Sequence, residues 1–275
     1  MNRLFLSAIA IFATVSLQAQ NVTWEKSKMD GSRTGVTTPG VDGFDATLGT
    51  VKGRTYYAPN GKKFRKGSTK KVAGLMIEAQ PKIAYVREVI GYSTHAMPRK
   101  SSDAALYNFA SDIVKEATEK VVGKKVDIGL INSGGIRVDM REGDILVDDI
   151  LSMFPFKNYL CYVALKGKDV RVLFERMARG HVQPVSGVTV TVKDRQLVEI
   201  LVGGEPLDDE KVYGLATVDF LLNGGDNIFA ARNAVELIQS EVLMNQAAMD
   251  YIRSLTAQGK QLDVERQQRV RYLED

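Results

Sequence analysis

The chain has 275 residues, of which 44% are hydrophobic and 25% are charged, and its formal net charge is +4. This ordinary globular composition excludes a disordered or fibrous chain, and the length allows one or two domains with a full core. A single cysteine, Cys161, excludes an internal disulfide. Because it lies in the apolar run "NYLCYVAL", we expect a small buried strand residue rather than a nucleophile.

The N-terminus is predicted to be a secretory signal peptide. Arg3 precedes an apolar run over residues 4–17, and small and polar residues follow, which places cleavage after Ala19. The run is too short to span a membrane comfortably, and no later stretch approaches eighteen apolar residues. We therefore expect residues 1–19 to be removed and the mature protein to be secreted or periplasmic, with no membrane span. A retained signal anchor is the alternative.

The next segment, residues 20–70, is predicted to be an extended arm followed by a basic hairpin. Residues 20–50 are rich in Gly, Thr, Asp and Ser, and Asn60-Gly61 lies between strand-prone flanks. Lys and Arg cluster in residues 61–72. This charge is typical of a solvated hairpin rim, although an acidic partner or substrate phosphates are alternatives. Few aromatic residues are interleaved with it, so we expect no nucleic acid partner.

Residues 71–275 are predicted to form one α+β domain, because apolar residues at helical spacing alternate with short β-prone runs. Helices are expected over residues 72–80, about 103–122, from 148, over 167–179 and over 237–258. Strands are expected over residues 85–93, 125–132, 159–167 and 211–222, with two more over 187–207 around an Asp194-Arg195 turn.

Two glycine pairs follow apolar runs, in "NSGGIR" at residues 132–137 and "NGGD" at residues 223–226. Neither sequence is a Walker loop or a dinucleotide-binding fingerprint. Ordinary strand-end turns, in which glycine supplies a positive φ, are one interpretation. Binding is the other, because polar side chains capable of gripping a sugar or phosphate border both turns.

The side chains near these turns are those of a nucleotide site. Arg137 offers a planar fork suited to phosphate oxygens, and Asp226 offers a carboxylate suited to a ribose diol. Phe156 and Phe220 are placed to hold a flat base, a contact worth roughly 1–3 kcal/mol per base.

Over about residues 85–270 the chain resembles the C-terminal domain of the secreted 5'-nucleotidases, a family that includes UDP-sugar hydrolases and 2',3'-cyclic nucleotide phosphodiesterases. The matching segments, in chain order, are "NSGGIR", "MFPFKN", "ALKGKDV" and "FLLNGGDNI". The resemblance implies a mixed sheet with packed helices, preceded by the N-terminal arm and hairpin. It also implies that this domain recognises the substrate.

The resemblance further implies roles for individual residues. Phe156 and Phe220 would stack on the base, Asp226 would bind the ribose hydroxyls, and Asn132 and Arg137 would reach the phosphate. The family also has an arginine near the start of the helix that precedes "NSGGIR", for which Arg99 is the nearest match, although its spacing to that helix differs. In the helix itself, Tyr107-Asn108-Phe109 stands where the family has Gly-Asn-Leu. The complete binding set implied is Arg99, Asn132, Gly134, Gly135, Arg137, Phe156, Phe220, Asn223 and Asp226.

The family's hydrolytic chemistry lies in a separate N-terminal metallophosphatase domain, where two metal ions activate water. Its Asp-x-His, Gly-Asn-His-Glu and Gly-His-x-His motifs are missing from this sequence, which has only two histidines. Neither His95 nor His181 lies at metal-ligand spacing from other ligand residues. We therefore expect no catalytic residue, no metal ligand and no cofactor in this chain, and residues 20–84 are too few for a metallophosphatase.

The resulting hypothesis is a split 5'-nucleotidase. A separate secreted metallophosphatase chain would contribute the divalent metal pair, and this chain would clamp the nucleotide and be inactive alone. A stand-alone nucleoside- or nucleotide-binding protein is one alternative, and a descendant with a vestigial pocket is another. The base preference stays open, because stacking tolerates any base.

Overall fold

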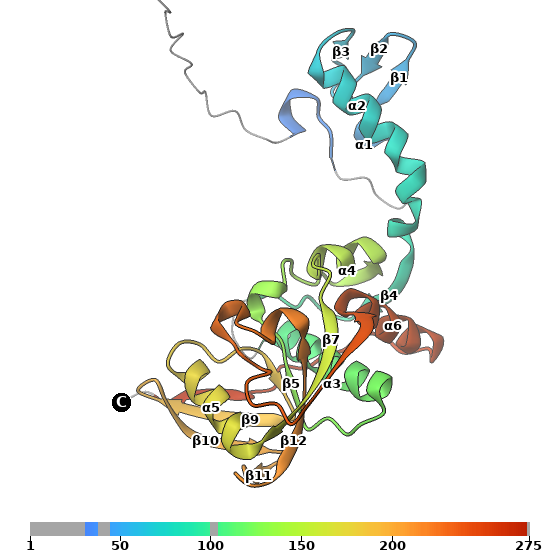
Figure 1. The fold of residues 1–275 in the computed structure, drawn as a ribbon. Coiled ribbons are helices and arrows are strands. Elements are labelled where there is room, and N and C mark those ends of the chain that lie inside the picture. Colours follow the sequence, from blue (N-terminus) through green and yellow to red (C-terminus); the bar gives the residue numbers. More distant parts are fainter. Residues whose placement is uncertain (1–30, 38–44, 100–103, 274–275) are drawn as a thin grey trace, which may run out of the picture.

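The computed structural model describes residues 31–37, 45–99 and 104–273 (Figure 1). The predicted signal peptide at residues 1–19 and much of the predicted arm lie outside these ranges. None of the helices within them is both long and apolar enough to cross a membrane.

A small unit precedes the main domain. It contains the helices η1 (Gly31–Arg33), α1 (Asp45–Leu48) and α2 (Ser68–Ala79), and an antiparallel sheet of β1 (Thr50–Lys52), β2 (Thr55–Tyr57) and β3 (Lys63–Phe64). The hairpin predicted around Asn60-Gly61 is confirmed, because it joins β2 to β3. Tyr56 and Ala58 from the sheet bury Ala73 of α2 in a core of their own. This core lies across the predicted boundary at residue 70.

The segment after α2 differs from the prediction. The helix predicted over residues 72–80 is confirmed as α2, which ends at Ala79 just before Pro81, but the 3-10 helix η2 (Gln80–Arg87) follows it directly. Pro81 lies in the first turn of η2, where a missing N–H is tolerated. The strand expected over residues 85–93 is therefore only β4 (Val89–Ser93), which pairs with β6 (Gly143–Leu146).

The centre of the main domain is a five-stranded mixed sheet, which confirms the α+β prediction. Its order is β13-β7-β12-β5-β8, and only β12 and β5 run parallel. The strands are β5 (Ile128–Leu130), β7 (Tyr159–Lys166), β8 (Val185–Ser186), β12 (Val212–Val218) and β13 (Glu236–Leu243).

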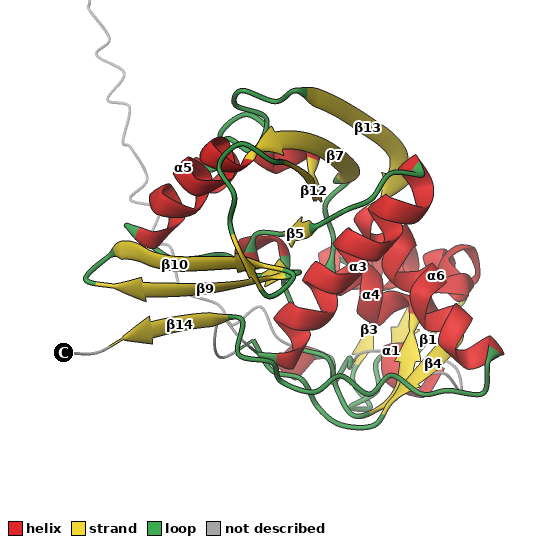
Figure 2. Ribbon diagram, turned by 90° about the horizontal axis from the view of Figure 1, so that it is seen from below, coloured by secondary structure: helices red, strands yellow, loops and turns green. Residues whose placement is uncertain are grey.

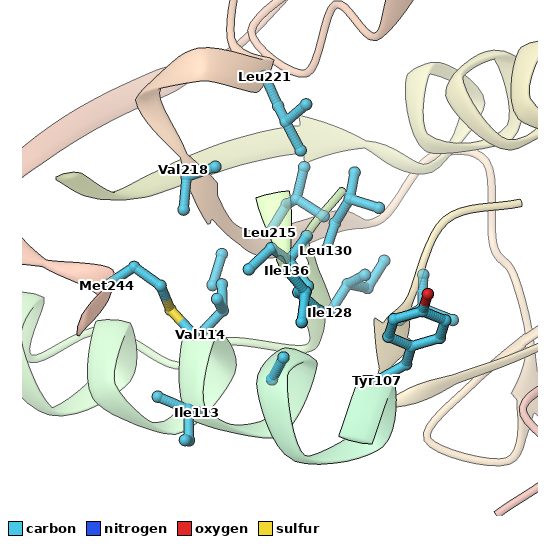
Figure 3. Close-up of a cluster of buried hydrophobic side chains, with 14 of the residues drawn as sticks. Tyr107, Ile113, Val114, Ile128, Leu130, Ile136, Leu215, Val218, Leu221 and Met244 are labelled. Atoms are coloured by element: carbon cyan, nitrogen blue, oxygen red, sulfur yellow. The ribbon is translucent and has the colours of Figure 1, made fainter. Parts of the chain in front are cut away.

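The long helix α3 (Ala105–Val122) packs on this sheet and ends at Gly123, which has the left-handed conformation expected of a C-cap. Ile113 and Val114 of α3 lie in one buried cluster with Ile128 and Leu130 of β5 and with Leu215 of β12 (Figure 3). Tyr107, part of the departure from the family pattern, is also buried. These contacts fix the positions of β5 and β12, from which the site is built.

A second sheet lies on the opposite side of the molecule from α6 (Met244–Ala257), as Figure 2 shows. Its order is β11-β10-β9-β14, and α5 (Gly167–Ala178) packs between it and the main sheet. The predicted Asp194-Arg195 turn is confirmed, because both residues have positive φ and join β9 to β10. The strands are β9 (Val188–Lys193), β10 (Gln196–Val202), β11 (Glu205–Pro206) and β14 (Val270–Leu273).

The helix predicted over residues 237–258 is wrong in its first third. Glu236–Leu243 is the edge strand β13, paired antiparallel with β7, and α6 begins only at Met244. Burial alternates along most of β13, which is the pattern of a half-covered strand. Its Leu, Gln and Glu residues favour helix in isolation, but pairing with β7 overrides that preference.

Candidate functional site

The strand order brings three segments that are distant in sequence to one edge of the main sheet. Parallel β5 and β12 end side by side, so the turns that follow them share this edge. Antiparallel β7 begins there, because Leu160 pairs with Val218 at the end of β12. The two glycine turns and the "MFPFKN" segment therefore converge.

These segments line a pocket of about 300 Å³. Such a volume is at the lower end of the range for small-molecule sites. Its lining residues are Asn132, Gly134, Arg137, Phe156, Asn158, Phe220 and Asp226. Six of these seven belong to the binding set predicted from the sequence, and the sheet topology alone brings them together.

The first turn, η3 (Ser133–Gly135), is held rigidly at the end of β5. The Gln183 carboxamide oxygen accepts from the Ser133 N–H at 2.8 Å and from its hydroxyl at 3.1 Å. Ile136 is fully buried, and the Arg137 N–H donates to the Met153 carbonyl at 2.9 Å. The turn is thereby fixed against α4 (Val147–Met153), the short helix expected from residue 148.

Asn132 and Asp226 join the two turns across 94 positions of sequence. The Asn132 Nδ2 donates to Asp226 Oδ2 at 2.7 Å, while Asn132 itself is 4% exposed. A Cβ at Gly135 would lie 3.0 Å from Asn132 Oδ1, so a side chain there would crowd the amide. Asp226 has a positive φ and is exposed, which leaves its carboxylate at the pocket surface.

The two phenyl rings are exposed at the pocket rather than sealed in the core. Phe156 is 48% exposed and Phe220 is 47% exposed, and both line the same hollow. A Cβ at Gly225 would lie 2.1 Å from the Phe220 carbonyl oxygen and 2.7 Å from two of its ring carbons. The ring of Phe220 therefore lies against the bare backbone of η5 (Gly225–Asn227), and only glycine allows this contact.

Arg137 is exposed and positioned at the rim. Its Nη1 donates to the Gly134 carbonyl at 3.0 Å, and no ion pair involves it within the described residues. Because the guanidinium has no carboxylate partner there, its charge and its remaining N–H groups are available to a phosphate.

Three predicted residues, Arg99, Gly135 and Asn223, do not line the pocket. Gly135 is buried within the first turn. Arg99 donates from Nε to an Asp139 carboxylate oxygen at 3.0 Å and from Nη1 to the Ile136 carbonyl at 3.0 Å, so it braces the chain just after the first turn. Asn223 is an exposed residue of the second turn. Their roles toward a ligand stay predictions.

Two residues of the site escaped the sequence reasoning. Asn158 lines the pocket, although it stands within the quoted segment "MFPFKN". Asp219 accepts from the Tyr159 N–H at 3.2 Å and from the Phe220 N–H at 2.9 Å, so one carboxylate ties together the segments that carry both rings. The sequence signal that could have identified Asp219 is that an acidic residue directly precedes Phe220 at the end of a strand.

Three other hollows in the described part of the chain lack this combination of two rings, an acid and a guanidinium. One beside α5 contains Phe229, Arg176 and Asp169, but it has a single ring and a volume of only about 30 Å³. One of about 390 Å³ lies between α3 and α6 and has a single lining ring, that of Tyr251. Another of about 480 Å³, lined by Arg179 and Arg195 among others, has no ring. The described residues contain no group of three His, Cys, Asp or Glu side chains that could hold a metal ion.

In β7, full burial raises the pKa of the Cys161 thiol to about 12, so it stays protonated near neutral pH.

The model of the 5'-nucleotidase C-terminal domain matches residues 88–233, more than half of the chain. This chain belongs to that family. The matched region contains both glycine turns and both phenylalanines, so the site belongs to the family domain and not to the N-terminal unit.

The chain is also similar in sequence to individual bacterial members of the family. The chain is 34% identical to Protein UshA of Escherichia coli over 107 residues and 31% identical to a 5'-nucleotidase of Vibrio cholerae over 107 residues. These matches cover 36% and 37% of this chain, but only 19% of each relative. The chain therefore matches about a fifth of the length of these curated relatives.

Solved structures extend the likeness over more of the chain. A 5'-nucleotidase precursor from Thermus thermophilus superimposes with a TM-score of 0.65 at 26% identity, over 74% of this chain and 43% of that one. The NAD nucleotidase of Haemophilus influenzae gives a TM-score of 0.57 at 16% identity, over 79% of this chain and 47% of that one, and shows the shared fold.

Proposed function

We propose that this chain is the nucleotide-recognition part of a 5'-nucleotidase-type hydrolase. The base would lie between Phe156 and Phe220, the ribose diol would donate to Asp226, and Arg137 with Asn132 would reach the phosphate. The observation that carries the proposal is that six residues predicted from the sequence line one open pocket. Two half-exposed rings, one acid and one guanidinium form a set that matches the three parts of a nucleotide.

We propose further that a separate metallophosphatase chain performs the hydrolysis outside the cytoplasm. That chain would supply the metal-activated water that attacks phosphorus. This chain would bind the base and ribose and so hold the phosphate ester in a fixed position, which is a positioning contribution to catalysis. The predicted signal peptide, together with the two histidines of the whole sequence, supports this division of labour.

Reconstitution tests the proposal. Phosphate release from AMP is measured with this chain alone, with a secreted metallophosphatase of the same genome that lacks a domain of this family, and with both, always with Mn²⁺ present. We expect no turnover from this chain alone and turnover from the mixture that depends on Phe220 and Asp226. Hydrolysis of AMP by this chain alone at enzyme-like rates would refute the division between two chains. Nucleotide binding without any gain in the mixture would favour a stand-alone binding protein.

A further inference from the structure

The helix α2 presents an apolar face to solvent. Its Ala73 and Ile77 pack against the small sheet, whereas Val72, Leu75 and Met76 are 53%, 59% and 41% exposed. Residues three and four apart lie on one side of a helix, so these three side chains form a continuous stripe. A stripe of this kind on a projecting helix marks an interaction surface.

Basic residues are concentrated in the sequence on both sides of this stripe, although α2 also carries Glu78, which pairs with Lys82 at 3.9 Å. Between residues 46 and 77 the chain has eight basic residues and no acidic one, so the remainder of the chain carries a net charge of −4. Within the described part of the chain, none of the eight forms an ion pair. They are Lys52, Arg54, Lys62, Lys63, Arg65, Lys66, Lys70 and Lys71. We call the stripe and these residues the basic unit.

The basic unit is connected to the nucleotide pocket through packed elements. Its α2 continues into η2, and η2 packs against α4 (Figure 1). Met153 at the end of α4 accepts from the Arg137 N–H, and Phe156 follows three residues later. The helix that carries the stripe is therefore linked through η2 to the helix that supports the pocket.

The charge selects among the occupants that could cover the stripe. A second copy of this chain would bring two sets of eight positive charges together, which opposes association. A protein with an apolar patch ringed by Asp and Glu would satisfy both the stripe and its rim. We propose that the basic unit docks such an acidic-rimmed patch on the metallophosphatase chain, an inference that rests on the proposed function above.

Binding of the purified metallophosphatase to the full chain provides the test. Affinity is measured by biolayer interferometry at low and high NaCl for the wild type, Leu75→Asp and the double variant Lys62→Glu/Lys63→Glu. Val172→Asp is the matched control, since Val172 is 56% exposed on α5, outside the basic unit. We expect Leu75→Asp to weaken docking at least about tenfold, the double variant to weaken it most at low salt, and the control to bind like the wild type.

Adenosine affinity, measured by calorimetry on the same variants, separates this inference from the proposed function and reports on folding. If Leu75→Asp binds adenosine and the metallophosphatase as the wild type does, the docking surface is refuted and the pocket stands. If docking follows the expected pattern but adenosine does not bind the wild type, the pocket assignment fails instead. A photo-crosslinker at position 75 that captures a second copy, or residues 1–30 of its own chain, contradicts the proposal. Equal loss of binding to phosphatidylglycerol vesicles in Leu75→Asp would reassign the surface to a membrane.

Discussion

The proposed nucleotide pocket and the outer face of α2 both leave large apolar side chains exposed, but the pocket is a concave surface and the face of α2 is a convex one. In the pocket, Phe156 and Phe220 line a hollow together with an acid, an amide and a guanidinium. On α2, Val72 and Leu75 are exposed on a helix, and the charges nearby in the sequence are predominantly basic. A concave surface with converging polar groups suits a small molecule, whereas a protruding stripe with a charged rim suits a protein.

The two regions also differ in how closely other atoms approach their glycines. At the pocket, glycine is required because other atoms press against it, as at Gly225. In α2, Gly74 has nothing within 4 Å of where its Cβ would be. The pocket is therefore expected to tolerate little change, and α2 to tolerate much, which the following substitutions test.

The largest effect is expected for Gly225→Ala. The added methyl would lie 2.1 Å from the Phe220 carbonyl oxygen, so the turn must move and carry the ring with it. We expect a loss of about 1–3 kcal/mol in the free energy of unfolding and the loss of measurable adenosine binding. Urea denaturation and calorimetry check both. Gly180→Ala, where the nearest atom is 3.9 Å away, is the control. Adenosine affinity retained within about twofold would contradict the proposed contact.

Asp226→Ala should come next. A hydrogen bond to a charged group contributes about 1.5–3 kcal/mol, so adenosine binding should weaken by about 10- to 150-fold if the ribose diol donates to this carboxylate. The variant also removes the acceptor of the buried Asn132 amide, so the free energy of unfolding should fall by about 1–3 kcal/mol. The control ligand is 2',3'-dideoxyadenosine. It lacks the ribose diol, so it should bind the wild type and the variant nearly equally. An equal loss for both ligands would show that Asp226 does not bind the diol.

Phe220→Ala should weaken adenosine binding by about 1–3 kcal/mol through lost stacking, and Phe220→Trp should restore it. Adenosine and uridine should lose affinity together, because stacking does not select a base. Val198→Ala removes another exposed apolar side chain, which is 58% exposed and does not line the pocket, and should have no effect. A Phe220→Ala variant with wild-type affinity would place the base elsewhere.

The smallest effect, of opposite sign, is expected for Gly74→Ala in α2. Alanine in a helix interior is favoured over glycine by about 0.5–1 kcal/mol, and the new methyl meets no atom. The small unit should therefore gain stability, measured as slower amide exchange of Ala73 and Ile77. Destabilisation would mean that the outer side of α2 is already packed against something.

The residues that line the pocket were easier to predict from the sequence than the contacts that hold them in place. Polar and aromatic side chains at two strand ends predicted six residues that line one pocket. The burial of Cys161, the hairpin and the Asp194-Arg195 turn followed from local patterns. What local patterns do not contain is which strands are neighbours. The bond between Asn132 and Asp226 and the double role of Asp219 exist only because β5, β12 and β7 share an edge.

The wrong predictions have the same origin. Residues 236–243 form a strand because β7 pairs with them, although their composition favours a helix. A strand is expected from residue 85, but Pro81 begins a 3-10 helix after the end of α2, and this helix extends to Arg87. In both places the outcome depends on the neighbouring element and not on the segment alone.

The central claim, that a base lies between Phe156 and Phe220, is tested most directly by nuclear Overhauser effects. The full chain with labelled phenylalanine is mixed with adenosine, and contacts from the H2 and H8 protons of the base are assigned with the aid of Phe156→Leu and Phe220→Leu. We predict contacts from the base to both rings in the wild type, with the loss of one set in each variant. Bound adenosine that contacts neither ring would contradict the account.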